Sequence, residues 1–197
     1  MNRRYALFGW LILLVAGISS PRVWAESCNT TVGDMTINTQ NVQYLPTLPV
    51  SSQMSHSLAD NGSGIEAEYI DKAFIRHATS KIATADDLGH IHTLGFRGEA
   101  LASIASVAKV EVLTKTEADE YACCYRIEGG EPQGMEPGAR PVGTTITVND
   151  LFYNTPARMK FLKKDSSEGT FVADTIAHVA LSHPEVSVKF IREGKLQ

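Results

Sequence analysis

Residues 60–65 read Asp60-Asn61-Gly62-Ser63-Gly64-Ile65, a polar stretch with two glycines two positions apart. Asp-Asn-Gly predicts a turn, and the glycines allow a positive φ or a close approach of the main chain to a ligand. Alone, such a hexapeptide is usually only a turn. Here it precedes apolar residues at helical spacing, which predict a helix over residues 66–77.

A second glycine-containing stretch follows at residues 93–101, Thr-Leu-Gly-Phe-Arg-Gly-Glu-Ala-Leu, and leads into a predicted helix that continues to Val107. The first amides of a helix lack partners within it, and together with the helix dipole they favour an anion. The Walker spacing Gly-x-x-x-x-Gly-Lys-Ser is absent. Phosphate binding is therefore inferred only from the two stretches together.

The rest of the chain alternates predicted strands and helices. Alternating apolar residues predict strands at Lys109–Thr114, Tyr121–Glu128 and Thr144–Asn149. Gly129-Gly130 and Pro137-Gly138 predict turns between the second and third strands. Asn154–Arg158 opens a helix with proline in its first turn, and another helix is predicted over Thr170–Ser182.

Several of these segments resemble one family in their order and spacing, that of the MutL-type DNA mismatch repair ATPases, within the GHKL superfamily. The segments are Asp60–Ile65, Ala78–Ile82, Gly95–Leu101, Gly143–Thr145 and Asn154–Arg158. The resemblance implies an α/β fold over residues 57–197. We expect an α+β two-layer sandwich of GHKL type, incomplete at its N-terminus, in which helices cover one face of a mixed sheet.

The resemblance also implies a nucleotide site for ATP. By analogy, Asp60 accepts a hydrogen bond from the adenine amino group, Gly62 and Gly64 permit close approach of the main chain, and Thr145 holds the adenine edge through water. Thr79, Ser80 and Lys81 resemble part of the lid over the nucleotide. The phosphates would be wrapped by the amides of five successive residues: Arg97, Gly98, Glu99, Ala100 and Leu101. The alternative for Arg97 and Glu99 is a surface ion pair beside a helix start.

One family feature is missing before residue 60. The family has a helix there with a glutamate that activates water and, four residues later, an asparagine that binds Mg²⁺. The nearest imitation is Glu26 and Asn29, three positions apart in strand-like sequence. We therefore assign no catalytic residue and no metal ligand, and expect ATP binding with impaired hydrolysis, although the family uses Mg²⁺. Whether the chain is an enzyme is left open.

The N-terminal part has a different character. Residues 1–25 combine Arg3 and Arg4 with an apolar run and a small-residue site, which predicts a signal peptide. The run is shorter than the roughly 20 residues of a membrane span, so no stable span is expected. Residues 26–56, with Cys28, resemble the mature N-terminus of a bacterial fimbrial subunit or adhesin. The leader thus implies export to the periplasm or beyond, whereas the MutL resemblance implies the cytoplasm.

Overall charge gives no reason to seek nucleic acid, since the 197 residues carry a net charge of −4. The resemblance nevertheless implies DNA and mismatch repair proteins as partners, with a homodimer as an open option. A small basic cluster comprises Arg158, Lys160, Lys163 and Lys164, and its alternative interpretation is a solvated helix face. The adjacent Cys123 and Cys124 are interpreted as the two faces of one strand, and no zinc site is predicted.

Three hypotheses follow. The first is a MutL-type nucleotide-binding fragment with an aberrant N-terminus. The second is a secreted fimbrial or adhesive protein, based on the leader and Cys28. The third is a chimeric reading frame, joined near residues 53–58, with no function as a whole.

Overall fold

The computed structural model describes residues 55–79, 82, 89–90, 96–184, 186–192 and 195–196. The predicted signal peptide, and all of the predicted fimbrial-like segment except residues 55–56, lie outside these ranges. The leader, the adhesin resemblance and the chimeric join stay predictions of the sequence.

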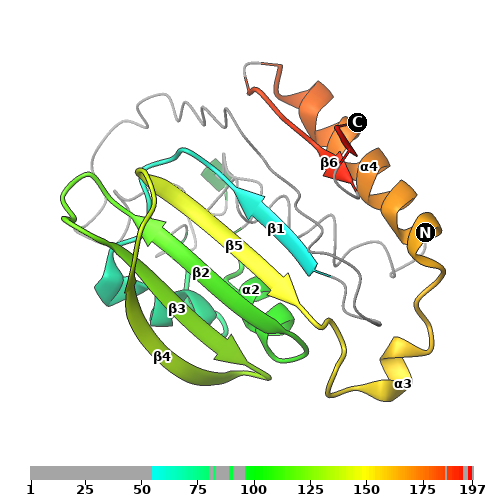
Figure 1. Ribbon diagram of the computed structural model, residues 1–197, viewed down its shortest axis with the longest axis horizontal. Coiled ribbons are helices and arrows are strands. Elements are labelled where there is room, and N and C mark those ends of the chain that lie inside the picture. The colour runs from blue at the N-terminus through cyan, green and yellow to red at the C-terminus, as the bar shows by residue number, and fades with distance from the viewer. Residues whose placement is uncertain are drawn as a thin grey trace.

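The centre of the described structure is a five-stranded sheet with the order β1-β5-β2-β3-β4 (Figure 1). Its strands are β1 (Ser55–Ala59), β2 (Lys109–Lys115), β3 (Ala122–Glu128), β4 (Glu131–Gly138) and β5 (Gly143–Asn149). Every pairing in this sheet is antiparallel, whereas the sequence analysis expects a mixed sheet. Short connections join β2, β3, β4 and β5 in turn, and a short connection favours antiparallel pairing because a parallel pair needs a long crossover.

Helical segments pack on one face of this sheet, as expected for a two-layer sandwich. They are η2 (Ala67–Tyr69), η3 (Asp71–Phe74) and α2 (Ala100–Ala105), which lies behind the sheet in Figure 1. Ile70 from the helical layer is fully buried, and Val112 and Ile146 from the sheet are 1% exposed in the same apolar cluster. This cluster is the main core of the described residues.

Two expectations about local structure differ from the result. Residues 66–77 form two short 3₁₀ turns instead of one α-helix, with the amides of Tyr69 and Ala73 donating to the carbonyls three residues back. Strand β4 is absent from the predicted elements. It contains two prolines, and because nearly all of its residues are exposed, its sequence lacks the alternation of apolar and polar residues that marks a half-buried strand.

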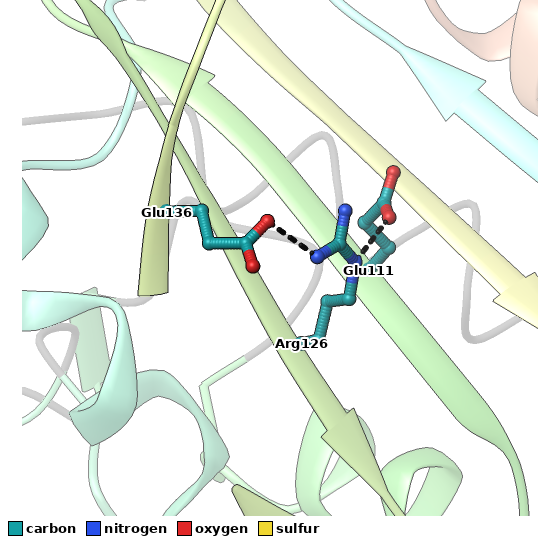
Figure 2. Close-up of polar contacts among 3 residues, drawn as sticks. All are labelled: Glu111, Arg126 and Glu136. Atoms are coloured by element: carbon teal, nitrogen blue, oxygen red, sulfur yellow. Dashed lines mark hydrogen bonds and ion pairs between the residues drawn. The ribbon is translucent and has the colours of Figure 1, made fainter. Parts of the chain in front are cut away.

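The opposite face of the sheet carries polar side chains. Arg126 on β3 donates to Glu111 on β2 and to Glu136 on β4, each over 2.8 Å (Figure 2). These hydrogen bonds raise the pKa of the Arg126 guanidinium. The cross-strand pairs lie in solvent, so they link three strands with little effect on stability.

The C-terminal part contains α3 (Pro156–Met159), α4 (Asp165–Ser182), β6 (Ile191–Arg192) and β7 (Lys195–Leu196). Helix α4 begins five residues before the predicted Thr170. Its Val172 and Ile176 form a second apolar cluster with Phe190, and β6 lies against α4 in Figure 1. Among the described residues, no helix has the length and apolarity needed to cross a membrane.

Candidate functional site

Asp60 is the first residue after β1 and is 5% exposed. Its Oδ1 accepts hydrogen bonds from the amide of Gly62 at 2.8 Å and from the amide of Thr144 at 3.1 Å. The Asp60 amide donates in turn to the Thr144 carbonyl at 2.8 Å. The carboxylate is thus held in one orientation at the end of the sheet. A hydrogen-bond acceptor that recognises a ligand needs such a fixed orientation.

Two buried threonines extend this polar group. Thr144 is fully buried and Thr114 is 1% exposed, and their hydroxyl oxygens lie 3.2 Å apart. Thr114 also accepts a hydrogen bond from the Ile65 amide at 2.7 Å, which ties residues 60–65 to β2. Buried hydroxyls in a core need such partners, because an unmade hydrogen bond there is costly. The local sequence assigns neither threonine a role in the site.

Thr145, the residue assigned to the adenine edge, lies on the other face of the sheet. Residues alternate between the faces of a strand, and Thr144 is in phase with the core residues Ile146 and Val148. Thr145 is half-buried, and its Oγ1 accepts a hydrogen bond from Arg140 at 3.1 Å. The residue that the fold brings to the Asp60 carboxylate is therefore Thr144. Extending the alternation of apolar residues back from Val148 would have shown this.

Gly64 has the conformation that the sequence analysis expects of a glycine, with a φ of +80°. A Cβ at this position would lie 2.1 Å from the Lys115 carbonyl oxygen. No side chain fits there, so the close approach at Gly64 is made to strand β2. Gly62 is half-buried, and its amide completes the turn on the Asp60 carboxylate.

The other glycine loop lies beside the segment that includes Thr79. The His77 amide donates to the Gly98 carbonyl at 3.1 Å, and a Cβ on Gly98 would lie 2.0 Å from the Ala78 carbonyl oxygen. Gly98 has a φ of +60° and His77 a φ of +65°. Two segments predicted for the same nucleotide, the lid and the phosphate loop, are therefore adjacent. Thr79 is half-buried, and Ser80 and Lys81 lie outside the described residues.

The side chains of the phosphate loop do not pair as an Arg97–Glu99 ion pair would require. Glu99 approaches His77, with 3.0 Å between Oε1 and Nδ1, and Arg97 lies over the Phe96 ring at 5.6 Å. Ala100 opens α2, and Leu101 packs into the core at 4% exposure. The Leu101 side chain anchors the loop to the core. The groups predicted to bind phosphate are the main-chain amides of the loop and not its side chains.

The two cysteines have the arrangement predicted for them. Cys123 packs against the main core. Cys124 is also buried, but it lies on the opposite face of β3, where it pairs with Glu136 of β4 in the strand register. Burial raises the pKa of both thiols, so the reactive thiolate form is disfavoured. In the part of the chain that the structure describes, no cluster of three or more His, Cys, Asp or Glu side chains could hold a metal ion.

Comparison with known proteins gives a consistent result. The chain is 49% identical over 138 residues to the DNA mismatch repair protein MutL of Agathobacter rectalis. It is 50% identical over 140 residues to MutL of Lactobacillus delbrueckii subsp. bulgaricus. These matches cover 70% and 71% of this chain but 21% of either relative, so the chain spans about a fifth of their length. No protein-family model matches the chain.

Solved structures agree. The Aquifex aeolicus MutL ATPase domain complexed with ADP superposes with a TM-score of 0.58 at 30% identity, covering 73% of this chain and 50% of that one. The N-terminal domain of a DNA repair protein superposes with a TM-score of 0.53 at 28% identity.

Fold and comparisons together define a class of protein: the described part of the chain has the fold of a GHKL-type ATPase domain and spans part of such a domain. The relatives narrow this class to one family. About 70% of the chain belongs to the MutL DNA mismatch repair proteins, as a portion of their N-terminal ATPase domain.

Proposed function

We propose that residues 57–197 bind adenine nucleotides. The observation that carries this proposal is the buried Asp60 carboxylate, which two main-chain amides hold beside Thr144 at the end of β1. An oriented carboxylate accepts a hydrogen bond from an exocyclic amino group, and adenine presents such a group. The superposed Aquifex aeolicus domain is complexed with ADP, which supports the same ligand class here.

The adenine subsite in this proposal consists of Asp60, Thr144 and the turn at Gly62, with Thr114 behind them. Thr144 takes the place that the sequence analysis assigns to Thr145, because it adjoins the carboxylate on the core face. The loop from Arg97 to Leu101 binds the phosphates. The tight fit of Gly98 against Ala78 supports this assignment, because it keeps the loop next to the segment of Thr79.

The test is a titration of the full chain with ADP and with inosine diphosphate, which lacks the amino group. Asp60→Asn keeps the size of the side chain but gives the amide a donor, so we expect ADP affinity to fall about tenfold or more. Arg126→Gln removes a charge from the opposite face of the same sheet and serves as the matched control. Circular dichroism checks that both variants fold. Equal ADP affinity in a folded Asp60→Asn variant would overturn the proposal.

We further propose that hydrolysis is impaired. The support is in the sequence, which has no glutamate followed four residues later by asparagine in a helical context before Asp60. Without a base to orient water and a ligand for Mg²⁺, phosphoryl transfer lacks its main chemical groups. Phosphate release from ATP with Mg²⁺ should not exceed that of Asp60→Asn. Release above that level, at ATP concentrations that saturate the parent protein, would contradict impaired hydrolysis.

DNA and other mismatch repair proteins are proposed as partners through the family relationship. Arg158, Lys160 and Lys164 are exposed on and after α3, where they are available to phosphates. Their contribution is electrostatic, so binding should weaken steeply with salt. Fluorescence anisotropy with a short duplex at two salt concentrations tests this. A double charge reversal, Lys160→Glu with Lys164→Glu, should abolish the anisotropy change. DNA binding that depends neither on salt concentration nor on this charge reversal would contradict the proposal.

A further inference from the structure

Arg140 lies in the connection between β4 and β5 and joins three strands at the Asp60 end of the sheet. Its Nη2 donates to the Asp60 carbonyl at 2.8 Å. Its Nη1 donates to the Leu113 carbonyl on β2 at 2.9 Å and to the Thr145 hydroxyl on β5 at 3.1 Å. Its Nε donates to the Pro141 carbonyl at 3.0 Å. One half-buried side chain thus reaches the end of β1, β2 and β5 together.

This contact acts on Asp60 from the face of the sheet opposite to its carboxylate. The Thr145 hydroxyl that Arg140 contacts is on the outer face, whereas Thr144 and the carboxylate are on the core face. Arg140 therefore donates to the main-chain carbonyl of Asp60 and not to its carboxylate. The pKa of the Arg140 guanidinium is lowered because it is partly buried, and the charge of Asp60 offsets part of this effect.

The contact is also made at the end of an edge strand. Strand β1 has five residues and pairs only with β5 within the described sheet. Asp60 follows its last residue, where an edge strand has few ladder hydrogen bonds to fix the main chain. The Asp60 amide is held by the Thr144 carbonyl, and its carbonyl is held by Arg140. Both main-chain polar groups of Asp60 are therefore fixed.

Gly143 makes room for this arrangement. Its φ is +128°, and a Cβ there would lie 2.3 Å from the Asp60 carbonyl oxygen and 2.8 Å from Arg140 Nη2. The guanidinium and the carbonyl meet across a position that only glycine leaves open.

We propose that Arg140 is a positioning residue of the adenine subsite, which sets the place of the Asp60 carboxylate by holding the Asp60 main chain from the outer face. This inference rests on the proposed nucleotide binding. A guanidinium suits the role because its planar fork presents several donors at once, whereas a lysine ammonium is a single point. Because Arg140 acts through Asp60, its loss should affect recognition of the adenine amino group more than affinity for the phosphates.

The test measures ADP and inosine diphosphate affinities in the full chain for the parent, Arg140→Gln and Arg140→Lys, with Arg126→Gln as the control that loses the same charge from β3. Arg140→Gln should weaken ADP binding about tenfold and inosine diphosphate binding by less than about threefold, so that the ratio of the two affinities shrinks. Arg140→Lys should fall between Arg140→Gln and the parent. Arg126→Gln should keep the parent's ratio.

The outcomes separate the two proposals. A purely structural loss lowers the folded fraction and weakens both nucleotides by the same factor, so an unchanged ratio in Arg140→Gln would overturn the role of Arg140. If Arg140→Gln does not fold, Arg140→Lys decides, since parent-like selectivity in that variant would overturn the requirement for the fork. Absence of ADP binding in the parent would overturn the proposed function, and the role of Arg140 with it.

Discussion

Asp60 and Thr144 exchange main-chain and side-chain hydrogen bonds across the end of the sheet. The Asp60 amide donates to the Thr144 carbonyl at 2.8 Å, and the Thr144 amide donates to Asp60 Oδ1 at 3.1 Å. The first bond continues the antiparallel pairing of β1 with β5 by one residue pair. In the second bond the Asp60 side chain takes the place of the Asp60 carbonyl, which would accept from the Thr144 amide in a regular pair. The edge strand therefore ends in a fixed carboxylate.

Thr144→Val and Thr145→Val should have different effects on nucleotide binding. Valine keeps the shape of threonine but removes the hydroxyl, which in Thr144 lies 3.2 Å from the Thr114 hydroxyl in the core. We expect Thr144→Val to weaken ADP binding about tenfold, and Thr145→Val by less than about threefold. Calorimetric titration of both variants with ADP measures this. The reverse order would restore the adenine role to Thr145.

Gly64→Ala should destabilise the fold. The added Cβ would meet the Lys115 carbonyl oxygen at 2.1 Å, and φ at Gly64 is +80°, so steric overlap and backbone strain act together. We expect the free energy of unfolding to fall by roughly 2–4 kcal/mol. Urea denaturation followed by circular dichroism gives the value.

Gly89→Ala is the matched control for that experiment, because a Cβ at Gly89 would have no atom within 4 Å. Its unfolding midpoint should stay within experimental error of the parent. Equal midpoints for Gly64→Ala and Gly89→Ala would show that residues 60–65 do not pack on β2 as described.

His56 should make stability depend on pH. It is 7% exposed, and burial lowers its pKa from 6.5 to about 4. Between these two pH values the unfolded chain binds more protons at this position than the folded chain does, so stability rises with pH through this window. The contribution is complete above about pH 6.5 and is lost as the pH falls to about 4.

His56→Gln removes this titration. Between pH 7 and pH 4 the parent should lose roughly 3 kcal/mol more free energy of unfolding than His56→Gln, as determined by urea denaturation at several pH values. Parallel pH profiles for the parent and His56→Gln would contradict the burial of a neutral imidazole.

Cys123 and Cys124 should react slowly with iodoacetamide. Burial raises both thiol pKa values, which lowers the thiolate fraction at a given pH. At pH 8, mass spectrometry of peptides should show alkylation of both cysteines slower than that of glutathione, and urea should remove the difference. Fast alkylation of the folded protein at either position would contradict the placement of β3.

The sequence predicts those parts of the fold whose local pattern and tertiary environment agree. The alternation in β2, β3 and β5 reflects one apolar core face, and the segments that carry the MutL resemblance locate Asp60 and the glycine loops. β1 was not predicted, because Ser55-His56-Ser57-Leu58-Ala59 is too polar to show the pattern of a strand. Residues 66–77 were predicted as one α-helix but form two 3₁₀ turns. The spacing of apolar residues does not distinguish these two types of helix.

The sequence by itself determined the family, the turn at Asp60 and the positions of the two glycine-containing stretches, because these depend on residue type and local order. Only the tertiary structure decided which threonine adjoins the carboxylate and what holds the Asp60 main chain. Thr144 meets Asp60 through the register of β5 against β1, and Arg140 reaches Asp60 from 80 positions away along the chain. Such relationships arise when strands pair across a sheet, and no local pattern of residues encodes them.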